Sequence, residues 1–498
     1  MSRYAKYGIR GIVSSSLWIY ISSLLDNFQG FIYWMLMSTL VGPTSLGIAS
    51  AITSIASLTM GLLNLGIDTG VRRFFGISLS HDNKDMLIRY FWSSYVFMGS
   101  LYIATGLSMM FLGLRGFEVG GISGIMLIFT SLTILGGLGG IPSALITSML
   151  KTEVIFFSVV LSIIARFLIG LTLTIVFNLG WVGAVAGNIA QLYVRMLIIL
   201  TYSLREVGRE LKVSLEALKD VLLAGIASWL PGVIASIGSS LGILSTYVIS
   251  GASETGYYYI TFTMCNVVIA VANSMISISF PVLSGISDGR KRLTFQLIKL
   301  GLAIVTPVAI YLMIYSWLPL SFFGRGYVEA SNLLTVMMIS TFPSIIASGI
   351  STLVYAYGNY GLVLFIGLAS NLARVILYCI LVPIYGGLGS SISYTIGSFI
   401  AFITSLYVAS KIGLRLDWGL IAKVIIPPAI LGCICMVTNL HWLISLLAMS
   451  STYVMYLRLK VVSKSELREL VKAVNLEALV KRIYGKYGDL IDRVLGIS

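Results

Sequence analysis

Apolar runs of about twenty residues follow one another along most of this 498-residue chain. A transmembrane helix needs ~20 apolar residues to cross the hydrocarbon core of a bilayer. Hydrophobic residues make up 57% of the chain and charged residues 10%, whereas an average soluble domain has about 25% charged residues. These features exclude a large soluble enzyme, a disordered protein and a nucleic-acid binder. They predict an all-α polytopic membrane protein and not a β-barrel, whose strands alternate over about ten residues.

The apolar runs predict about 14 transmembrane helices. They are expected at residues 16–40, 46–67, 87–113, 121–149, 154–177, 181–203, 221–249, 257–280, 294–318, 328–355, 361–384, 387–409, 418–438 and 441–459. An even number of spans places both termini on the same side of the membrane.

Positive charge is distributed very unevenly between the two sides of the membrane. When the loops are assigned alternately, 28 of the 33 Lys and Arg residues fall on the side of the N-terminus. The other side receives only Arg115 and Arg325, and three arginines lie inside helices. Because cytoplasmic loops of membrane proteins are enriched in Lys and Arg, we expect both termini in the cytoplasm.

The chain contains an internal repeat, with three landmarks that recur at nearly one spacing. They are the segments Gly42–Gly47 and Gly251–Gly256 (offset 251 − 42 = 209), the residues Arg166 and Arg374 (374 − 166 = 208), and the segments Gly180–Gly183 and Gly386–Gly389 (386 − 180 = 206). A recurrence of this kind predicts two six-helix lobes. Since six is even, the lobes have the same orientation and form a parallel repeat.

The repeat divides the chain into five predicted parts. They are an N-terminal six-helix lobe (1–204), a cytoplasmic amphipathic linker (205–220), a C-terminal six-helix lobe (221–410), two additional transmembrane helices (411–460) and a cytoplasmic amphipathic tail (461–498). The linker has Leu211, Leu215 and Leu218 on one side, which favours a helix lying at the membrane surface.

Three charged residues lie near the middle of predicted spans: Asp26, Arg166 and Arg374. A lone ion at this depth costs at least ~2.5–3.5 kcal/mol on insertion scales, so each must face a partner or a water-filled cavity. One interpretation is an internal ion pair between Asp26 and one arginine, which would serve only folding. Since one arginine then remains, the alternative is a cationic cavity.

Polar residues at helical spacing favour one shared cavity between the lobes. Asn188, Gln191 and Arg195 share a face of one predicted helix, and Asn371 and Arg374 share a face of another. The candidate substrate-binding residues are Arg166, Arg374, Arg195, Asn188, Gln191, Asn371 and Arg72. The candidates for binding a coupling ion, H⁺ or Na⁺, are Asp26 and Asp68.

No motif for catalysis, for a cofactor or for a metal site occurs in the sequence. The four cysteines, Cys265, Cys379, Cys433 and Cys435, lie inside apolar runs and are interpreted as packing residues. We therefore expect no catalytic residue, no cofactor and no metal.

Five short motifs resemble those of polysaccharide-biosynthesis flippases, in the same order and at similar spacing. They are Val41–Gly47, Asn64–Phe74, Ser279–Ser284, Phe323–Ala330 and Val382–Gly389. The resemblance covers about residues 10–410 and places the chain in the multidrug/oligosaccharidyl-lipid/polysaccharide exporter superfamily. One departure follows Gly42-Pro43, where the family usually has an acidic residue and this chain has Thr44 and Ser45.

The resemblance implies two lobes around a central cavity and a transporter that works by alternating access. Its cargo would be a polyprenyl-(pyro)phosphate-linked oligosaccharide, moved from the cytoplasmic to the outer leaflet. Midplane arginines suit such an anion. Two alternatives remain open: an ion-coupled multidrug exporter of the same fold, and a multi-span membrane glycosyltransferase. The expected partners are the lipid-linked oligosaccharide, membrane lipids and H⁺ or Na⁺, but no nucleic acid.

Overall fold

The computed structural model describes residues 8–208, 210–279, 283, 288–459 and 461. Among these residues the regular structure is helical, apart from one isolated β-bridge between Val119 and Ile122. The predicted tail at 461–498 lies almost entirely outside the described residues, and so does most of the motif Ser279–Ser284.

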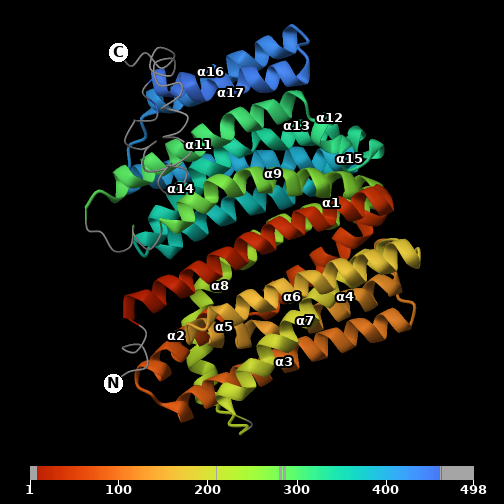
Figure 1. Cartoon of the computed structure of the whole chain (residues 1–498), viewed down its shortest axis with the longest axis vertical. Helices are drawn as coiled ribbons and strands as arrows, with labels where there is room; N and C mark the ends of the chain where they lie inside the picture. Colours follow the sequence, from red (N-terminus) through yellow and green to blue (C-terminus); the bar gives the residue numbers. More distant parts are fainter. Residues whose placement is uncertain (1–7, 209, 280–282, 284–287, 460, 462–498) are drawn as a thin grey trace, which may run out of the picture. The chain divides into compact units, whose positions relative to one another are not determined.

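The helices follow the predicted apolar runs closely (Figure 1). They are α1 (Gly8–Leu63), α2 (Ile67–Ser80), α3 (Lys84–Leu114), α4 (Gly124–Gly136), η2 (Gly137–Gly139), α5 (Gly140–Ser148), α6 (Thr152–Leu171), η3 (Thr172–Val176), α7 (Trp181–Val207), α8 (Leu215–Ser250), α9 (Ala252–Ile278), α11 (Arg290–Ile314), α12 (Trp317–Ser321), η4 (Arg325–Ala330), α13 (Ser331–Ile339), α14 (Thr341–Ala356), α15 (Tyr360–Lys411), α16 (Trp418–Val437) and α17 (Trp442–Arg458).

Eleven helices among the described residues are long and apolar enough to cross a membrane. Two of them are each interrupted by a non-helical residue, α1 at Gly42 and α15 at Gly386, which divides each into two predicted spans. The chain is thus an all-α, multi-pass membrane protein. The number of 14 crossings stays a prediction.

The repeat is visible in the backbone at the glycines that begin its landmarks. Gly42 (φ 74°, ψ 176°) and Gly251 (φ 87°, ψ 178°) have nearly the same conformation. Gly180 (φ 53°, ψ −125°) and Gly386 (φ 58°, ψ −134°) form a second matched pair. Such positive-φ conformations are accessible almost only to glycine. Each pair therefore marks the same turn in both halves of the repeat.

The expected surface helix over the linker does not form as a separate element. Helix α7 continues to Val207, and α8 begins at Leu215. Gly208 (φ 86°) ends α7, and the Ser214 hydroxyl accepts a bond from the Ala217 amide at the start of α8. Gly208 thus marks the end of one helix and Ser214 the beginning of the next, so a short non-helical link joins α7 to α8.

An unpredicted amphipathic helix, α2, lies instead directly after the second predicted span. Ile67, Val71 and Phe75 are buried along one face, whereas Arg72 and Arg73 are exposed. The positive φ angles of Leu65 and Gly66 separate α2 from α1. The apolar spacing of four residues was the signal for this helix.

Contacts group the chain into two compact units that do not follow the predicted lobe boundaries. The first comprises Met1–Ile260, Leu320–Ala330 and Asn371–Ser393, and the second comprises Thr261–Pro319, Ser331–Ser370 and Tyr394–Ser498. The lobes at 1–204 and 221–410 are defined by the repeat and stay a prediction.

Within the first unit, the long helices α1, α6 and α7 pack against one another (Figure 1). A buried apolar cluster around Phe75, Phe91 and Tyr102 joins α2 and α3 to the neighbouring helices. Within the second unit, α16 and α17 pack on α11. There the Tyr315 hydroxyl donates to the Leu440 carbonyl at 2.7 Å, which fixes the start of α17.

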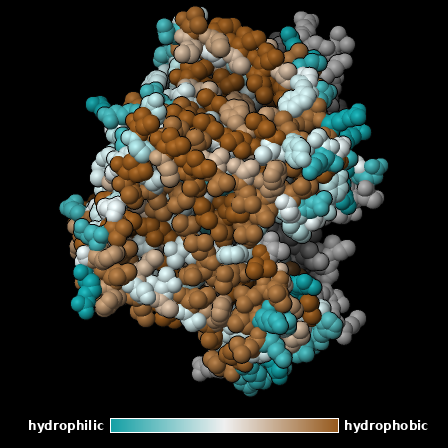
Figure 2. All heavy atoms as spheres, turned by 180° about the vertical axis from the view of Figure 1, so that it is seen from behind, coloured by the Kyte–Doolittle hydropathy of each residue, from teal (hydrophilic) through white to brown (hydrophobic). Residues whose placement is uncertain are grey.

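Helix α6 exposes apolar side chains and buries polar ones, which is the arrangement that a lipid environment requires. Leu161, Ile164 and Leu168 are 51–64% exposed, whereas Ser158, Ser162 and Arg166 are buried. Apolar side chains likewise cover most of the face shown in Figure 2, and hydrophilic side chains gather toward its margins. A polar interior under an apolar surface stabilises a protein in lipid and not in water.

Candidate functional site

Three helices of the first unit bring the predicted polar residues together. Helix α1 carries Asp26 and Gln29, α6 carries Arg166, and α7 carries Gln191 and Arg195. On α1 and on α7 these residues are three or four positions apart and so lie on one face of each helix. The faces meet because α1, α6 and α7 are in mutual contact.

The centre of this polar seam is the guanidinium of Arg166, whose side chain is only 4% exposed. Its Nη1 donates to Gln191 Oε1 at 2.8 Å and to Gln29 Oε1 at 3.2 Å. Its Nε is buried and has no hydrogen-bond partner among the residues that the structure describes. Amides of two helices thus hold one arginine of a third helix, which fixes the position of the charge.

Aromatic rings complete the surroundings of Arg166. Its guanidinium carbon lies 3.9 Å from the centroid of the Tyr33 ring and 5.6 Å from that of Trp34. Tyr33 is fully buried and donates to the Ala184 carbonyl at 2.6 Å. A desolvated cation over an aromatic face gains about 2 kcal/mol. No carboxylate lies within ion-pair distance of Arg166 in the described chain, so its charge is stabilised but not neutralised.

Asp26 forms its ion pair with Arg195 and not with Arg166. The Arg195 guanidinium binds both carboxylate oxygens, with Nη1 at 2.9 Å from Oδ2 and Nη2 at 2.5 Å from Oδ1. Both side chains remain about 30% exposed, at 27% for Arg195 and 32% for Asp26. The bidentate geometry is the strong form of this interaction. Of the two predicted roles of Asp26, this contact favours the ion pair.

The remaining candidates of this half lie apart from Arg166. Asn188 is half-buried on α7, one turn before Gln191. Arg72 is exposed on α2. No contact in the described chain links either residue to Arg166.

In the second half of the repeat, the arginine at the equivalent position has a different environment. Arg374 on α15 is half-buried, and its Nη1 donates to Asn371 Oδ1 of the same helix at 3.2 Å. Gly238 on α8 occupies the position equivalent to Gln29 (29 + 209 = 238). A Cβ atom on Gly238 would lie 1.7 Å from Asn371 Oδ1, so this glycine makes room for the Asn371 amide.

The aromatic residue beside each arginine also changes helix between the halves. Tyr33 on α1 packs against Gly170 on α6, where an added Cβ would lie 2.3 Å from the Tyr33 hydroxyl. In the second half Tyr378 on α15 packs against Gly242 on α8, where the corresponding distance is 2.8 Å. The large and the small residue have thus exchanged helices. The repeat conserves the pair of arginines in the sequence but not the side chains that surround them.

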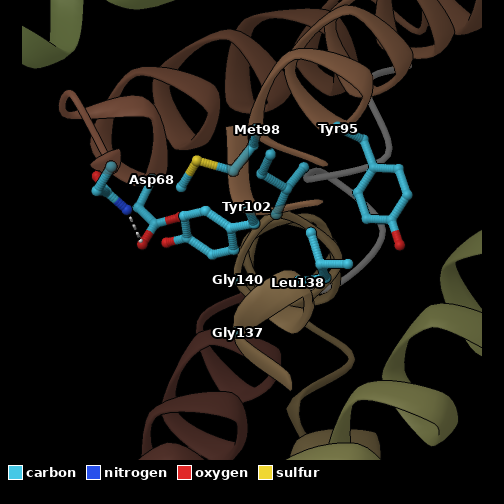
Figure 3. Close-up of a pocket in the computed structure, with 9 residues that line it drawn as sticks. Asp68, Tyr95, Met98, Tyr102, Gly137, Leu138 and Gly140 are labelled. Carbon is cyan, nitrogen blue, oxygen red and sulfur yellow. Dashed lines mark hydrogen bonds between the residues drawn. The ribbon is translucent and has the colours of Figure 1, made fainter. Parts of the chain in front are cut away.

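Asp68 lies away from the arginine seam and lines a small cavity (Figure 3). Asn64, Asp68, Tyr95, Met98, Tyr102, Gly137, Leu138, Gly140 and Ile141 line it. The cavity offers about 20 Å³ for the centres of water molecules, enough for one water molecule or a small ion. Asn64 Nδ2 donates to Asp68 Oδ2 at 2.9 Å, whereas Oδ1 is buried and accepts no hydrogen bond from the described part of the chain.

Sequence reasoning missed the aromatic part of the arginine site. Tyr33 was not among the predicted site residues, although it follows Asp26 by seven residues and so lies on the same face of the helix. That spacing was the available signal. In the described chain, no three His, Cys, Asp or Glu side chains are grouped closely enough to hold a metal ion.

Solved structures of the same fold are transporters. A lipid II flippase MurJ in an inward closed conformation matches with a TM-score of 0.72 and 15% identity, covering 89% of this chain and 98% of that one. A multidrug resistance MATE transporter of the MOP superfamily, in an inward-facing conformation, matches at 0.62 and 15% identity, covering 79% and 94%. A MOP superfamily transporter from Pyrococcus furiosus, described by the reverse polarity of its binding pocket, matches at 0.54 and 13% identity, covering 81% and 95%. At these identities the likeness shows the fold.

A search of curated proteins gave no match. The sequence pattern of one family matches residues 36–332, which is more than half of the chain and includes the α1, α6 and α7 seam. The family is described as polysaccharide biosynthesis protein. The match agrees with the resemblance of the five short motifs and with the fold. The chain belongs to the polysaccharide biosynthesis protein family.

Proposed function

We propose that this protein is a flippase that moves a polyprenyl-(pyro)phosphate-linked oligosaccharide from the cytoplasmic to the outer leaflet by alternating access. The family and the fold support transport in polysaccharide biosynthesis. The observation that carries the substrate class is the buried Arg166, which forms no ion pair with a carboxylate among the described residues. A fixed positive charge inside the membrane favours a substrate that brings negative charge.

The charges of the first unit argue against a multidrug exporter of organic cations. Such an exporter needs an acidic side chain that is open to a bulky cation. Asp26 is already bound on both oxygens by Arg195. Asp68 lines a cavity with only about 20 Å³ for water centres, which is far too small for a drug-sized molecule.

The polar seam around Arg166 also offers arginine and amide side chains, which suit the phosphate and the sugar of a headgroup. Arginine presents a planar set of donors to phosphate oxygens. The half-exposed Arg195 and Asn188 lie along α7 on the same face as Gln191, at the spacing predicted from sequence. We propose that a headgroup binds along this face. Arg374 and Asn371 would contribute from the second half of the repeat.

A membrane glycosyltransferase is the alternative from another class. Such an enzyme needs acidic residues positioned for transfer chemistry. Across the outer loops predicted from sequence, the acids are only Glu118, Glu254 and Glu329. Glu254 accepts a bond from the Gly387 amide at 2.9 Å, and Glu329 accepts one from the Tyr257 hydroxyl at 3.0 Å. These contacts give both carboxylates a structural role.

Reconstitution into liposomes tests the proposal. The purified protein is incorporated together with a short lipid-linked oligosaccharide, and an impermeant glycosidase is added outside. We expect the fraction of sugar open to the enzyme to rise from that of one leaflet toward that of both. The same vesicles are tested for uptake of a fluorescent organic cation and for sugar transfer. Cation uptake or transfer without flipping would contradict the proposal.

A further inference from the structure

We infer that the cavity beside Asp68 is a binding site for a small monovalent cation, with Na⁺ as the ion that fits best. The site lies between the start of α2, the middle of α3 and the break between α4 and α5. Binding by itself does not depend on the proposed function. A role of the ion in driving transport does rest on it.

The first observation is the carboxylate of Asp68. Its Oδ2 accepts from Asn64, but its buried Oδ1 accepts no hydrogen bond and no ion pair reaches it in the described chain. Asp68 lies in the first turn of α2. A carboxylate oxygen that is shielded from solvent and left without a donor or a cation is costly. A bound cation removes this cost.

The second observation is the break in the helix opposite Asp68. Helix α4 ends at Gly136, the residues Gly137–Gly139 form a 3₁₀ turn, and α5 begins at Gly140. The residues around this turn keep right-handed helical backbone angles, so Gly124–Ser148 continues as one span. A short 3₁₀ stretch inside a helix often marks a functional hinge. In membrane transporters, irregular backbone that lines a cavity is a place where Na⁺ or H⁺ binds.

The glycines of this break let the backbone approach the carboxylate. A Cβ atom on Gly140 would lie 3.0 Å from Asp68 Oδ1, and one on Gly137 would lie 2.6 Å from the Met60 sulfur. In Figure 3 the carboxylate of Asp68 and the ring of Tyr102 lie in the same part of the cavity, while the Tyr95 hydroxyl points away. The oxygens of Asp68 and Tyr102 suit a hard cation.

No positive side chain of the described residues takes the place of the cation. Arg72, one turn further along α2, is exposed and forms no ion pair with Asp68. Among the lining residues, Tyr95 and Tyr102 of α3 are the other titratable ones, and only Tyr102 has its hydroxyl near Asp68; the break between α4 and α5 contributes none. On α8, which packs against α2, Asp220 accepts from the Tyr90 hydroxyl. None of the residues that line the cavity carries a positive charge.

The test is Na⁺ binding to the purified full chain in lipid nanodiscs, without substrate. Melting temperature is followed while NaCl replaces choline chloride at constant ionic strength, with KCl as a second series. Binding of ²²Na⁺ is measured on the same samples. We expect saturable stabilisation by Na⁺, weaker stabilisation by K⁺ and none by choline.

Two variants test the site in different ways. Asp68→Asn removes the charge and keeps the shape, and Gly140→Ala keeps the charge and fills the space beside Oδ1. Each is expected to weaken Na⁺ binding roughly tenfold or more. Asp85→Asn is the matched control for charge, since Asp85 pairs with Arg89 and Lys212 at the surface. Gly232→Ala is the control for glycine, because nothing lies within 4 Å of its added Cβ.

The inference is overturned by a wild-type protein that shows no preference for Na⁺ over choline. It is equally overturned if folded Asp68→Asn and Gly140→Ala both bind ²²Na⁺ with wild-type affinity. Sodium binding lost in both variants and kept in both controls supports it. Since no lipid-linked substrate is present, failure of the proposed flipping function leaves this outcome unchanged.

Discussion

The hydroxyls of Thr44 and Ser253 lie 2.7 Å apart, although the two residues are separated by 209 positions. That separation equals the offset of the repeat, so each residue bonds its own counterpart. The glycines beside them pack in the same reciprocal way. An added Cβ on Gly47 would lie 1.8 Å from the Ala252 carbonyl oxygen, and one on Gly256 would lie 2.0 Å from that of Pro43. A pseudo-twofold axis therefore passes between Thr44 and Ser253.

This contact yields a cross-linking prediction. Cysteines that replace Thr44 and Ser253 should form a disulfide under mild oxidation, because their hydroxyls are already in contact. If alternating access opens this contact, oxidation should stop flipping and a reductant should restore it. The measurement is flipping before oxidation, after it and after reduction, in a background without Cys379 and Cys433. Each single cysteine variant is the control. Full flipping by the cross-linked protein would show that the contact stays closed during transport.

The glycines at the repeat landmarks give a prediction on stability. Gly42→Ala and Gly251→Ala should each cost about 1–3 kcal/mol, because their backbone conformation is almost exclusive to glycine. Gly47→Ala should cost more, since its added methyl group meets the Ala252 carbonyl. Melting temperatures in detergent measure both effects. Gly30→Ala, which has nothing within 4 Å of the added atom, should change little. Equal melting temperatures for Gly47→Ala and Gly30→Ala would contradict the close packing.

The two arginines should respond differently to the same substitution. Arg166→Ala removes a buried cation–π contact and two charge-assisted hydrogen bonds, so it should destabilise the protein by about 2–4 kcal/mol as well as impair binding. Arg374→Ala should weaken binding of a lipid diphosphate by about 1.5–3 kcal/mol, with a smaller effect on folding. Affinity and melting temperature are measured on the same samples.

Lysine and a distant arginine provide the controls for this comparison. Arg166→Lys and Arg374→Lys should restore binding only in part, because a point charge lacks the bidentate geometry of the guanidinium. Arg115→Ala changes an exposed arginine next to Phe111 and should leave affinity unaltered. Well-folded Arg374→Ala protein with wild-type affinity would remove this residue from the proposed site.

Asp26 and Arg195 should behave as one unit. Either Asp26→Asn or Arg195→Gln alone breaks a bidentate pair, whereas the double variant leaves no unpaired charge. We expect a coupling energy of about 0.5–2 kcal/mol in a double-mutant cycle of melting free energies, since partial exposure reduces the strength of the pair. Flipping by Asp26→Asn should keep its response to ion gradients. Loss of that response with unchanged stability would return Asp26 to the role of ion ligand.

The charge asymmetry of the sequence predicts the topology, which labelling can test. Thr44, Arg325, Lys84 and Lys291 are all exposed, so cysteines there are accessible from whichever side they face. An impermeant maleimide added outside intact cells should label positions 44 and 325 and spare positions 84 and 291. Permeabilised cells, in which all four positions should react, are the control. External labelling at 291 would show that a span has been missed or added before it.

The sequence predicted the helices well, because continuous apolar runs can only be satisfied as helices in lipid. It predicted the repeat as well, since Gly42 and Gly251 are needed wherever the same turn occurs. The expected surface helix at the linker does not form, although Leu211 and Leu215 have helical spacing. Gly208 ends α7, and Ser214 caps the start of α8. Helix α2 was missed because fourteen residues with two arginines do not resemble a span.

The sequence by itself determined that charged and polar residues share helix faces, since helical spacing fixes which side chains are neighbours. Only the tertiary structure decided which charges meet. Arg195 and not Arg166 binds Asp26, and this depends on how α7 is rotated against α1. The cavity beside Asp68 also depends on packing, because the glycines between α4 and α5 approach Asp68 only in the folded chain. Partners on different helices are set by packing, and no spacing along one chain encodes that.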